Sequence, residues 1–157
     1  MKMTFREELE AVMEKELTVL TELKELSFKK ADMIINNHMR ELEETTKKEE
    51  TLINEMALLE EEREKLLDTW GLAVNTPISN VIERIPEDNS RLIYIRDKMK
   101  EVMAELSLRN KLNNDLIQDN LDWIDFNMNL ITNTHIDPGY GKENKKSSGN
   151  SIFDRKV

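Results

Sequence analysis

The sequence of 157 residues contains no cysteine, only four glycines and three prolines, and few aromatic residues. The absence of cysteine excludes disulfide bonds, thiolate metal sites and cysteine nucleophiles. Scarce glycine and proline favour long helices joined by few turns. No apolar run approaches the ~18 residues of a membrane-spanning helix, and the N-terminal residues lack the apolar stretch of a secretory signal. We therefore expect a soluble, cytoplasmic, all-α protein.

The charge is acidic overall, with a formal net charge of −9, and it is unevenly distributed. Residues 1–70 contain 11 basic and 19 acidic residues, whereas residues 137–157 contain five basic and three acidic ones. An acidic surface repels nucleic acid and anionic lipid, so we predict neither nucleic-acid binding nor membrane insertion. The last segment is rich in Gly, Ser, Lys and Asn, a composition that cannot bury enough apolar area to fold. The sequence therefore predicts a helical domain over residues 1–136 and a flexible basic tail over residues 137–157.

Two long helices are predicted in the first half of the chain. Thr4 with Glu7 fits a capping box, and the helix that it opens should end near Ile35, before the break at Asn36-Asn37. A second helix should run from His38 to Trp70, with Gly71 at its C-terminal cap. The acidic run around Glu60 is assigned to a solvated face. The expected seam has alternating spacings of four and three residues: Leu52, Met56, Leu59, Arg63, Leu66 and Trp70.

The second half predicts one short and one long helix. Thr76-Pro77 is typical of an N-cap followed by proline in the first helical position, which opens a short helix over about 77–84. A third long helix should begin among Asp88, Asn89 and Ser90 and end near Asn133. A single helix of such length needs partners to bury its apolar stripe. The predicted fold is an elongated antiparallel bundle of three long helices plus one short helix.

The residues that could carry chemistry form no recognisable site. His38 and His135 lack the Glu-x-x-His spacing of a di-iron bundle. The carboxylates are expected on solvated helix faces, where nothing shifts a pKa for acid–base work. No phosphate-binding loop is present. We therefore predict a protein that is not an enzyme and has no catalytic residue, metal or cofactor.

The end of the third long helix carries two unusual patterns. Asn113, Asn120 and Asn127 recur every seven residues. They are either buried residues that set the helix register or part of a half-buried edge, and we favour the second interpretation. Residues 121–131 are apolar on more than one face, which indicates several partners. Either this surface binds another protein, or residues 71–88 fill a wider core there.

The order of these elements resembles the FlgN family of flagellar type III export chaperones. The resemblance spans essentially the whole chain. Its best-matching segments are Glu49–Leu67, Asp122–Ile131 with Tyr140-Gly141, and Ile152-Phe153-Asp154. None of these is a catalytic signature, and the joint order of the segments carries the resemblance.

The resemblance implies a small cytosolic helical protein that binds terminal helices of hook-associated flagellar proteins, prevents their premature assembly and delivers them to the export gate. The alternative is a structural coiled-coil homo-oligomer or an adaptor without a secreted client. The tail would either dock at the export gate or only solubilise the protein, and the candidate docking residues are Tyr140, Ile152 and Phe153. The candidate client-binding residues are Leu116, Trp123, Ile124, Phe126, Met128, Leu130 and Ile131.

Overall fold

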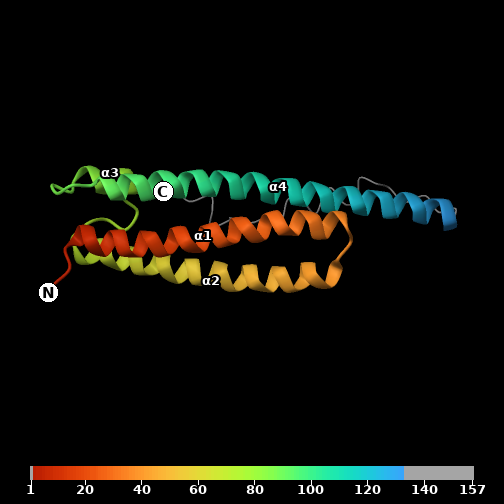
Figure 1. The fold of residues 1–157 in the computed structure, drawn as a ribbon, viewed down its shortest axis with the longest axis horizontal. Coiled ribbons are helices and arrows are strands. Elements are labelled where there is room, and N and C mark those ends of the chain that lie inside the picture. The colour runs from red at the N-terminus through yellow and green to blue at the C-terminus, as the bar shows by residue number, and fades with distance from the viewer. Residues whose placement is uncertain (1, 133–157) are drawn as a thin grey trace.

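Three long helices lie side by side, and one short helix closes one end of the bundle (Figure 1). The computed structural model describes the backbone of residues 2–132 and the side chains of residues 2–119 and 122. The predicted boundary between a helical domain and a tail, after residue 136, lies outside this range. The structure confirms the all-α class and the three long helices plus one short helix. The helices are α1 (Phe5–Ile35), α2 (Met39–Thr69), α3 (Ile78–Glu83) and α4 (Ser90–Thr132).

Local sequence signals place the ends of α1 and α2 where predicted. The hydroxyl of Thr4 accepts a hydrogen bond from the backbone N–H of Glu7, and the Glu7 carboxylate accepts one from the backbone N–H of Thr4. Asn37 ends α1 with a φ of 57°, and Gly71 follows α2 with a φ of 77°. Asparagine and glycine tolerate this left-handed backbone better than other residues do.

The start of α3 differs from the prediction by one residue. Pro77, and not Thr76, is the N-cap, because its ψ of 138° is extended and its carbonyl accepts the bond from the N–H of Val81. The N–H of Thr76 donates to the carbonyl of Ala73 in the preceding turn. The turn therefore continues through Thr76 and leaves the first helical position to Ile78.

The start of α4 is stabilised by the residues that were predicted to cap it. Asn89 accepts the first helical bond, from the N–H of Ile93, and its side-chain amide donates to the carbonyl of Ile82 in α3. The carboxylate of Asp88 accepts a bond from the backbone N–H of Ser90. This bond holds the pKa of Asp88 below its ordinary value.

The central helix of the bundle is α1, which packs against α2 on one side and α4 on the other. Helices α1 and α2 are antiparallel, whereas α1 and α4 run in the same direction, so the long helices run up, down and up. The pairs of α1 with α2 and of α1 with α4 make most of the contacts between the helices. The core is therefore organised around the apolar stripe of α1. Its most deeply buried residues are Leu9, Met13, Leu20, Leu23, Leu67, Val81, Ile82, Leu92, Ile95, Met99 and Leu106.

The predicted seam of α2 is right in its middle and wrong at its end. Met56 and Leu59 are buried, but Trp70 is 51% exposed, and Leu67 takes the buried position near the end of the helix. Leu66 is only half-buried. A straight α-helix drifts by about 20° per heptad relative to a strict seven-residue repeat, so the contact stripe moves to the next residue along a helix of this length.

A polar cluster joins α1 to α4 near the far end of α1. Asn113 is 3% exposed, and its side-chain amide donates to the carbonyl of Ser27 at 2.8 Å. The hydroxyl of Ser27 donates to the side-chain oxygen of Asn110, also at 2.8 Å. The interpretation of these asparagines as a half-buried edge is therefore wrong at Asn113. The packing instead supports the register-setting interpretation there, because a buried amide needs its partner.

The same register makes α4 project beyond the other two helices. Asn110 and Asn113 lie beside Ser27, and α1 ends eight residues later, at Ile35. Since both helices rise equally per residue, α4 passes the end of α1 near residue 120 and continues to Thr132. We call residues 121–132 the α4 overhang; Figure 1 shows it running past the turn between α1 and α2.

We predict that Asn113→Ala destabilises the protein by about 1–2 kcal/mol, because Ser27 loses buried hydrogen bonds and a cavity remains. Asn114→Ala is the matched control, since Asn114 is exposed on the same turn. Urea unfolding followed by circular dichroism measures both variants. Equal stability of the two variants would contradict a register role for Asn113.

Candidate functional site

The candidate client-binding residues lie mainly on the α4 overhang. Its backbone is helical as far as Thr132. Leu116, which precedes the overhang, is half-buried. The side chains of Trp123, Ile124, Phe126, Met128, Leu130 and Ile131 lie outside those that the structure describes, as do the docking candidates Tyr140, Ile152 and Phe153.

The structure excludes one of the two explanations for the apolar overhang, a wider core filled by residues 71–88. Residues 71–88 connect α2 to α4 at the opposite end of the bundle, with α3 packed beside the first turns of α4 (Figure 1). The explanation that this segment fills a wider core around residues 121–131 is therefore wrong. Neither α1 nor α2 extends as far as the overhang, because both helices end at the turn that joins them.

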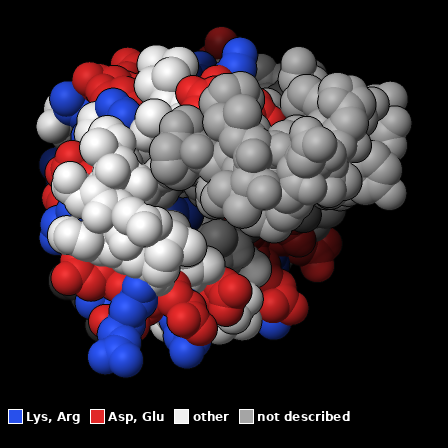
Figure 2. Space-filling view, turned by 90° about the vertical axis from the view of Figure 1, so that its right-hand side faces the viewer, with Lys and Arg blue, Asp and Glu red and all other residues white. Residues whose placement is uncertain are grey.

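The end of the bundle next to the overhang exposes apolar side chains. Ile35 at the end of α1 is 65% exposed, and Met39 at the start of α2 is 60% exposed. Figure 2 views the molecule from this end and shows uncharged side chains gathered in a patch, with acidic and basic side chains around it. The exposed apolar side chains within this uncharged surface make it a candidate for protein contacts.

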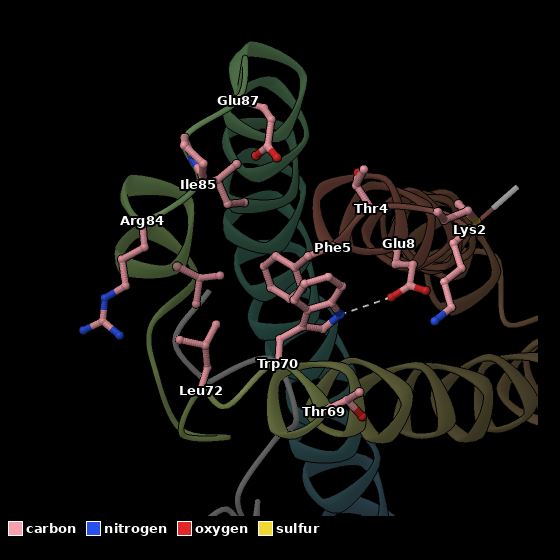
Figure 3. Close-up of a pocket in the computed structure, with 13 residues that line it drawn as sticks. Lys2, Thr4, Phe5, Glu8, Thr69, Trp70, Leu72, Arg84, Ile85 and Glu87 are labelled. Carbon is pink, nitrogen blue, oxygen red and sulfur yellow. Dashed lines mark hydrogen bonds between the residues drawn. The ribbon is translucent and has the colours of Figure 1, made fainter.

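A pocket of about 790 Å³ opens at the other end of the bundle, between the start of α1, the end of α2, and α3 with the loop that follows it (Figure 3). Its walls are mainly apolar, and Phe5 and Trp70 pack together with ring centroids 5.3 Å apart. The indole N–H of Trp70 donates to the Glu8 carboxylate at 3.4 Å. Arg84 lines the rim and points away from the two rings.

The sequence pattern did not indicate this pocket, although Trp70 at the end of a charged helix and Phe5 after a helix cap were available signals. The pocket forms only because the antiparallel pairing of α1 and α2 brings these distant residues together. Its polar lining residues are Lys2, Thr4, Glu8, Thr69, Arg84 and Glu87. The contact between Phe5 and Trp70 and the bond to Glu8 join α1 to α2, and we assign the pocket this structural role.

A buried carboxylate lies between α1 and α2, contrary to the prediction that all carboxylates are solvated. Glu16 is fully buried, and Glu60, which was assigned to a solvated face, is 7% exposed. The guanidinium of Arg63 lies 3.7 Å from the Glu16 carboxylate. Met56, Glu60, Arg63 and Leu67 follow the four-and-three spacing of a buried helix face, a pattern that the surrounding run of glutamates conceals in the sequence.

The burial of Glu16 changes its acidity. Desolvation raises the pKa of Glu16 from 4.5 to about 7; the nearby charge of Arg63 opposes this rise, and the carboxylates of Glu60 and Glu62 add to it. Within the described residues, neither carboxylate oxygen of Glu16 has a hydrogen-bond partner. Glu16 does not line the pocket at the end of the bundle. The shifted pKa of Glu16 therefore bears on the stability of the contact between α1 and α2.

No described side chains form a metal centre. Over residues 2–119 and 122, no three His, Asp or Glu side chains are grouped closely enough to hold a metal ion. His38 is exposed, and its Nδ1 lies 3.7 Å from the Glu41 carboxylate. His135 lies outside the described residues.

The sequence matches the FlgN protein family over residues 1–148. The chain belongs to the FlgN family. Membership makes it a flagellar export chaperone by class and confirms the predicted resemblance. The family is a chaperone family and is not known for enzymatic activity.

The remaining comparisons add no closer relative. No curated protein and no solved structure shows a significant match to this FlgN-family chain. A search of the described helices for an apolar stretch that could cross a membrane finds none.

We predict that Glu16→Gln stabilises the protein above neutral pH. The folded-state pKa of Glu16 is raised, so the stability of the wild type is complete below about pH 4.5 and falls as the pH rises through about 7. One unit of pKa shift corresponds to about 1.4 kcal/mol. The rise of the pKa from 4.5 to about 7 therefore predicts a gain on the order of 3 kcal/mol at about pH 8 and a much smaller gain at about pH 5.

Thermal unfolding of the wild type and the variant across this pH range measures the effect. Glu22→Gln serves as the control, because Glu22 is exposed on the same helix. This variant should have nearly the same stability as the wild type at every pH. If the difference between Glu16→Gln and the wild type does not grow with pH, the proposed titration of Glu16 is wrong.

Proposed function

We propose that this chain is a cytoplasmic chaperone that binds the terminal helices of hook-associated flagellar proteins, prevents their premature assembly and delivers them to the export gate. Membership of the FlgN family supports the chaperone class. The observation that carries the finer proposal is the α4 overhang, a helix of mixed apolar faces that extends past both neighbouring helices. A helix that extends past its neighbouring helices is suited to bind another amphipathic helix.

The proposed mechanism is the protection of one amphipathic helix by another. A client with an unpaired terminal helix exposes an apolar stripe that promotes polymerisation. The chaperone covers this stripe with the apolar residues of its overhang, in the helix-in-groove mode. Because the client must also leave, the affinity should be micromolar to high nanomolar, which corresponds to roughly −8 to −10 kcal/mol.

The proposed docking function belongs to residues 137–157. This segment carries the basic excess of the chain and the apolar candidates Tyr140, Ile152 and Phe153. A tyrosine offers a large contact area and loses little rotamer entropy on binding. We propose that the tail, as a unit separate from residues 1–136, contacts the export gate while the overhang holds the client.

We predict that Trp123→Ala and Leu130→Ala each weaken the binding of a purified hook-associated protein by on the order of 2 kcal/mol, as expected of interface anchors. The helix content should stay near wild type, because both residues follow the point where α4 passes the end of α1. Titration calorimetry measures binding, and circular dichroism measures helix content.

Leu58→Ala is the control for this pair, since Leu58 is 67% exposed on α2 and should leave binding unchanged. A loss of helix content in step with binding would assign Trp123 and Leu130 to a core instead. Self-association of the wild type that the hook-associated protein does not displace would favour the structural homo-oligomer.

We also predict that deletion of residues 137–157 leaves the melting temperature and client binding near wild type but lowers client export, since a segment of this composition adds no core. An export assay with Tyr140→Ala and with a scrambled tail of equal charge tests the role of specific residues. Normal export from both variants would show that the tail only solubilises the protein.

A further inference from the structure

An exposed aromatic ring and an arginine meet on the seam between α1 and α4. Phe28 of α1 is 45% exposed. The guanidinium carbon of Arg109 in α4 lies 4.4 Å from the centroid of the Phe28 ring, a cation–π contact. Phe28 directly follows Ser27 and Arg109 directly precedes Asn110, so the contact lies beside the polar cluster, in the half of the bundle from which the overhang projects.

Among the described side chains, Arg109 differs from Arg91 and Lys24 on this seam because it has no carboxylate partner. Arg91 forms an ion pair with Glu14, and Lys24 forms one with Glu105 at 3.0 Å. Within the part of the chain that the structure describes, Arg109 makes no ion pair, and its buried Nε has no hydrogen-bond partner. Among the described residues, the guanidinium of Arg109 thus contacts an aromatic ring and no anion, which leaves it available to the carboxylate of a partner.

Apolar side chains continue the surface on both helices. Leu112 is 40% exposed and Ile35 is 65% exposed, whereas Leu116 is half-buried. Ile35 follows Phe28 by seven residues, and Leu112 and Leu116 follow Arg109 by three and seven, so each set shares one face of its helix. We call Phe28, Ile35, Arg109, Leu112 and Leu116 the Phe28 patch. Trp123 and Leu130 continue the seven-residue spacing of Arg109 and Leu116 into the overhang.

We propose that the Phe28 patch receives an amphipathic helix of the client, whose apolar stripe covers Phe28 and Leu112 and whose Asp or Glu side chain pairs with Arg109. This proposal rests on the proposed function for the identity of the partner and extends the binding surface from the overhang onto the body of the bundle. Charge complementarity selects the partner: the patch offers one cation and no free anion among its five residues. Arginine and aromatic side chains are the residues that most often dominate such interfaces.

The same chemistry disfavours a second copy of this chain as the occupant. In a twofold dimer the patch would face itself, so two copies of Arg109 would enter one interface. Like charges brought together at a desolvated surface oppose association. A client helix with a carboxylate in its stripe removes this repulsion and satisfies the guanidinium.

A charge-reversal experiment tests the proposal. Arg109→Glu should weaken the binding of a purified hook-associated protein about tenfold, and Phe28→Ala should weaken it to a similar degree. Lys111→Glu is the matched control, because Lys111 is exposed on α4, two residues from Arg109, and its replacement changes the net charge equally. Calorimetry measures affinity, and circular dichroism verifies that each variant is folded.

Two designed helical peptides probe the patch without the client. Both carry the same leucine stripe, and they differ by Glu or Lys at one position beside it. The wild type should prefer the Glu peptide by about tenfold, and Arg109→Glu should reverse the preference. Fluorescence anisotropy of labelled peptides gives both affinities.

The two arms separate the failure of this proposal from the failure of the proposed function. If the wild type binds the hook-associated protein and Arg109→Glu behaves like Lys111→Glu, the Phe28 patch is not the site. If the wild type does not bind the hook-associated protein, the proposed function fails. The difference in affinity between the Glu and Lys peptides then tests whether the Phe28 patch binds an acidic helix. Equal binding of both peptides, or a wild-type dimer that Arg109→Glu dissociates in sedimentation, overturns the proposal.

Discussion

The hydrogen bonds between Ser27 and the asparagines of α4 determine how far α4 projects beyond its neighbours. Leucine, isoleucine and methionine recur along both α1 and α4, so sliding one helix by a heptad would still bury apolar surface. It would, however, separate Asn113 from Ser27, and a buried amide without a partner is strongly unfavourable. The length of the overhang and the contact of Phe28 with Arg109 both follow from this one register.

The two ends of the bundle are stabilised in different ways. At the end closed by α3, leucine, isoleucine and methionine from all four helices share one core. Toward the turn between α1 and α2, the buried positions become small or polar, as at Ser27, Ala31 and Thr45. Between these two ends, Glu16 and Arg63 form an ion pair inside the contact of α1 with α2. Replacing a buried ion pair with apolar residues of similar size often stabilises a protein. The end closed by α3 therefore contributes most of the apolar core. The end near the turn between α1 and α2 buries smaller and polar residues and exposes the apolar side chains of Ile35 and Met39.

Features encoded within a few residues were predictable. The capping box at Thr4, the break at Asn36-Asn37 and the glycine after α2 depend on bonds and dihedral angles that neighbouring residues determine. The burial of Glu16 and Glu60 was not predictable, because a run of glutamates has the composition of a solvated surface. Only the pairing of α1 with α2 decides which members of such a run face inward. The pocket at Phe5 and Trp70 was missed for the same reason, since its two rings are distant in sequence.

The sequence by itself determined the helical class, the number of long helices, their limits and the family, because these follow from local propensity, periodicity and the order of segments. The tertiary structure alone decided that α1 lies between α2 and α4, that Asn113 is buried, and that residues 121–132 extend past the turn between α1 and α2. These properties depend on the relative register of helices separated by tens of residues. Periodic sequences fit several registers almost equally well, and the choice is made by side chains that meet only in the folded protein.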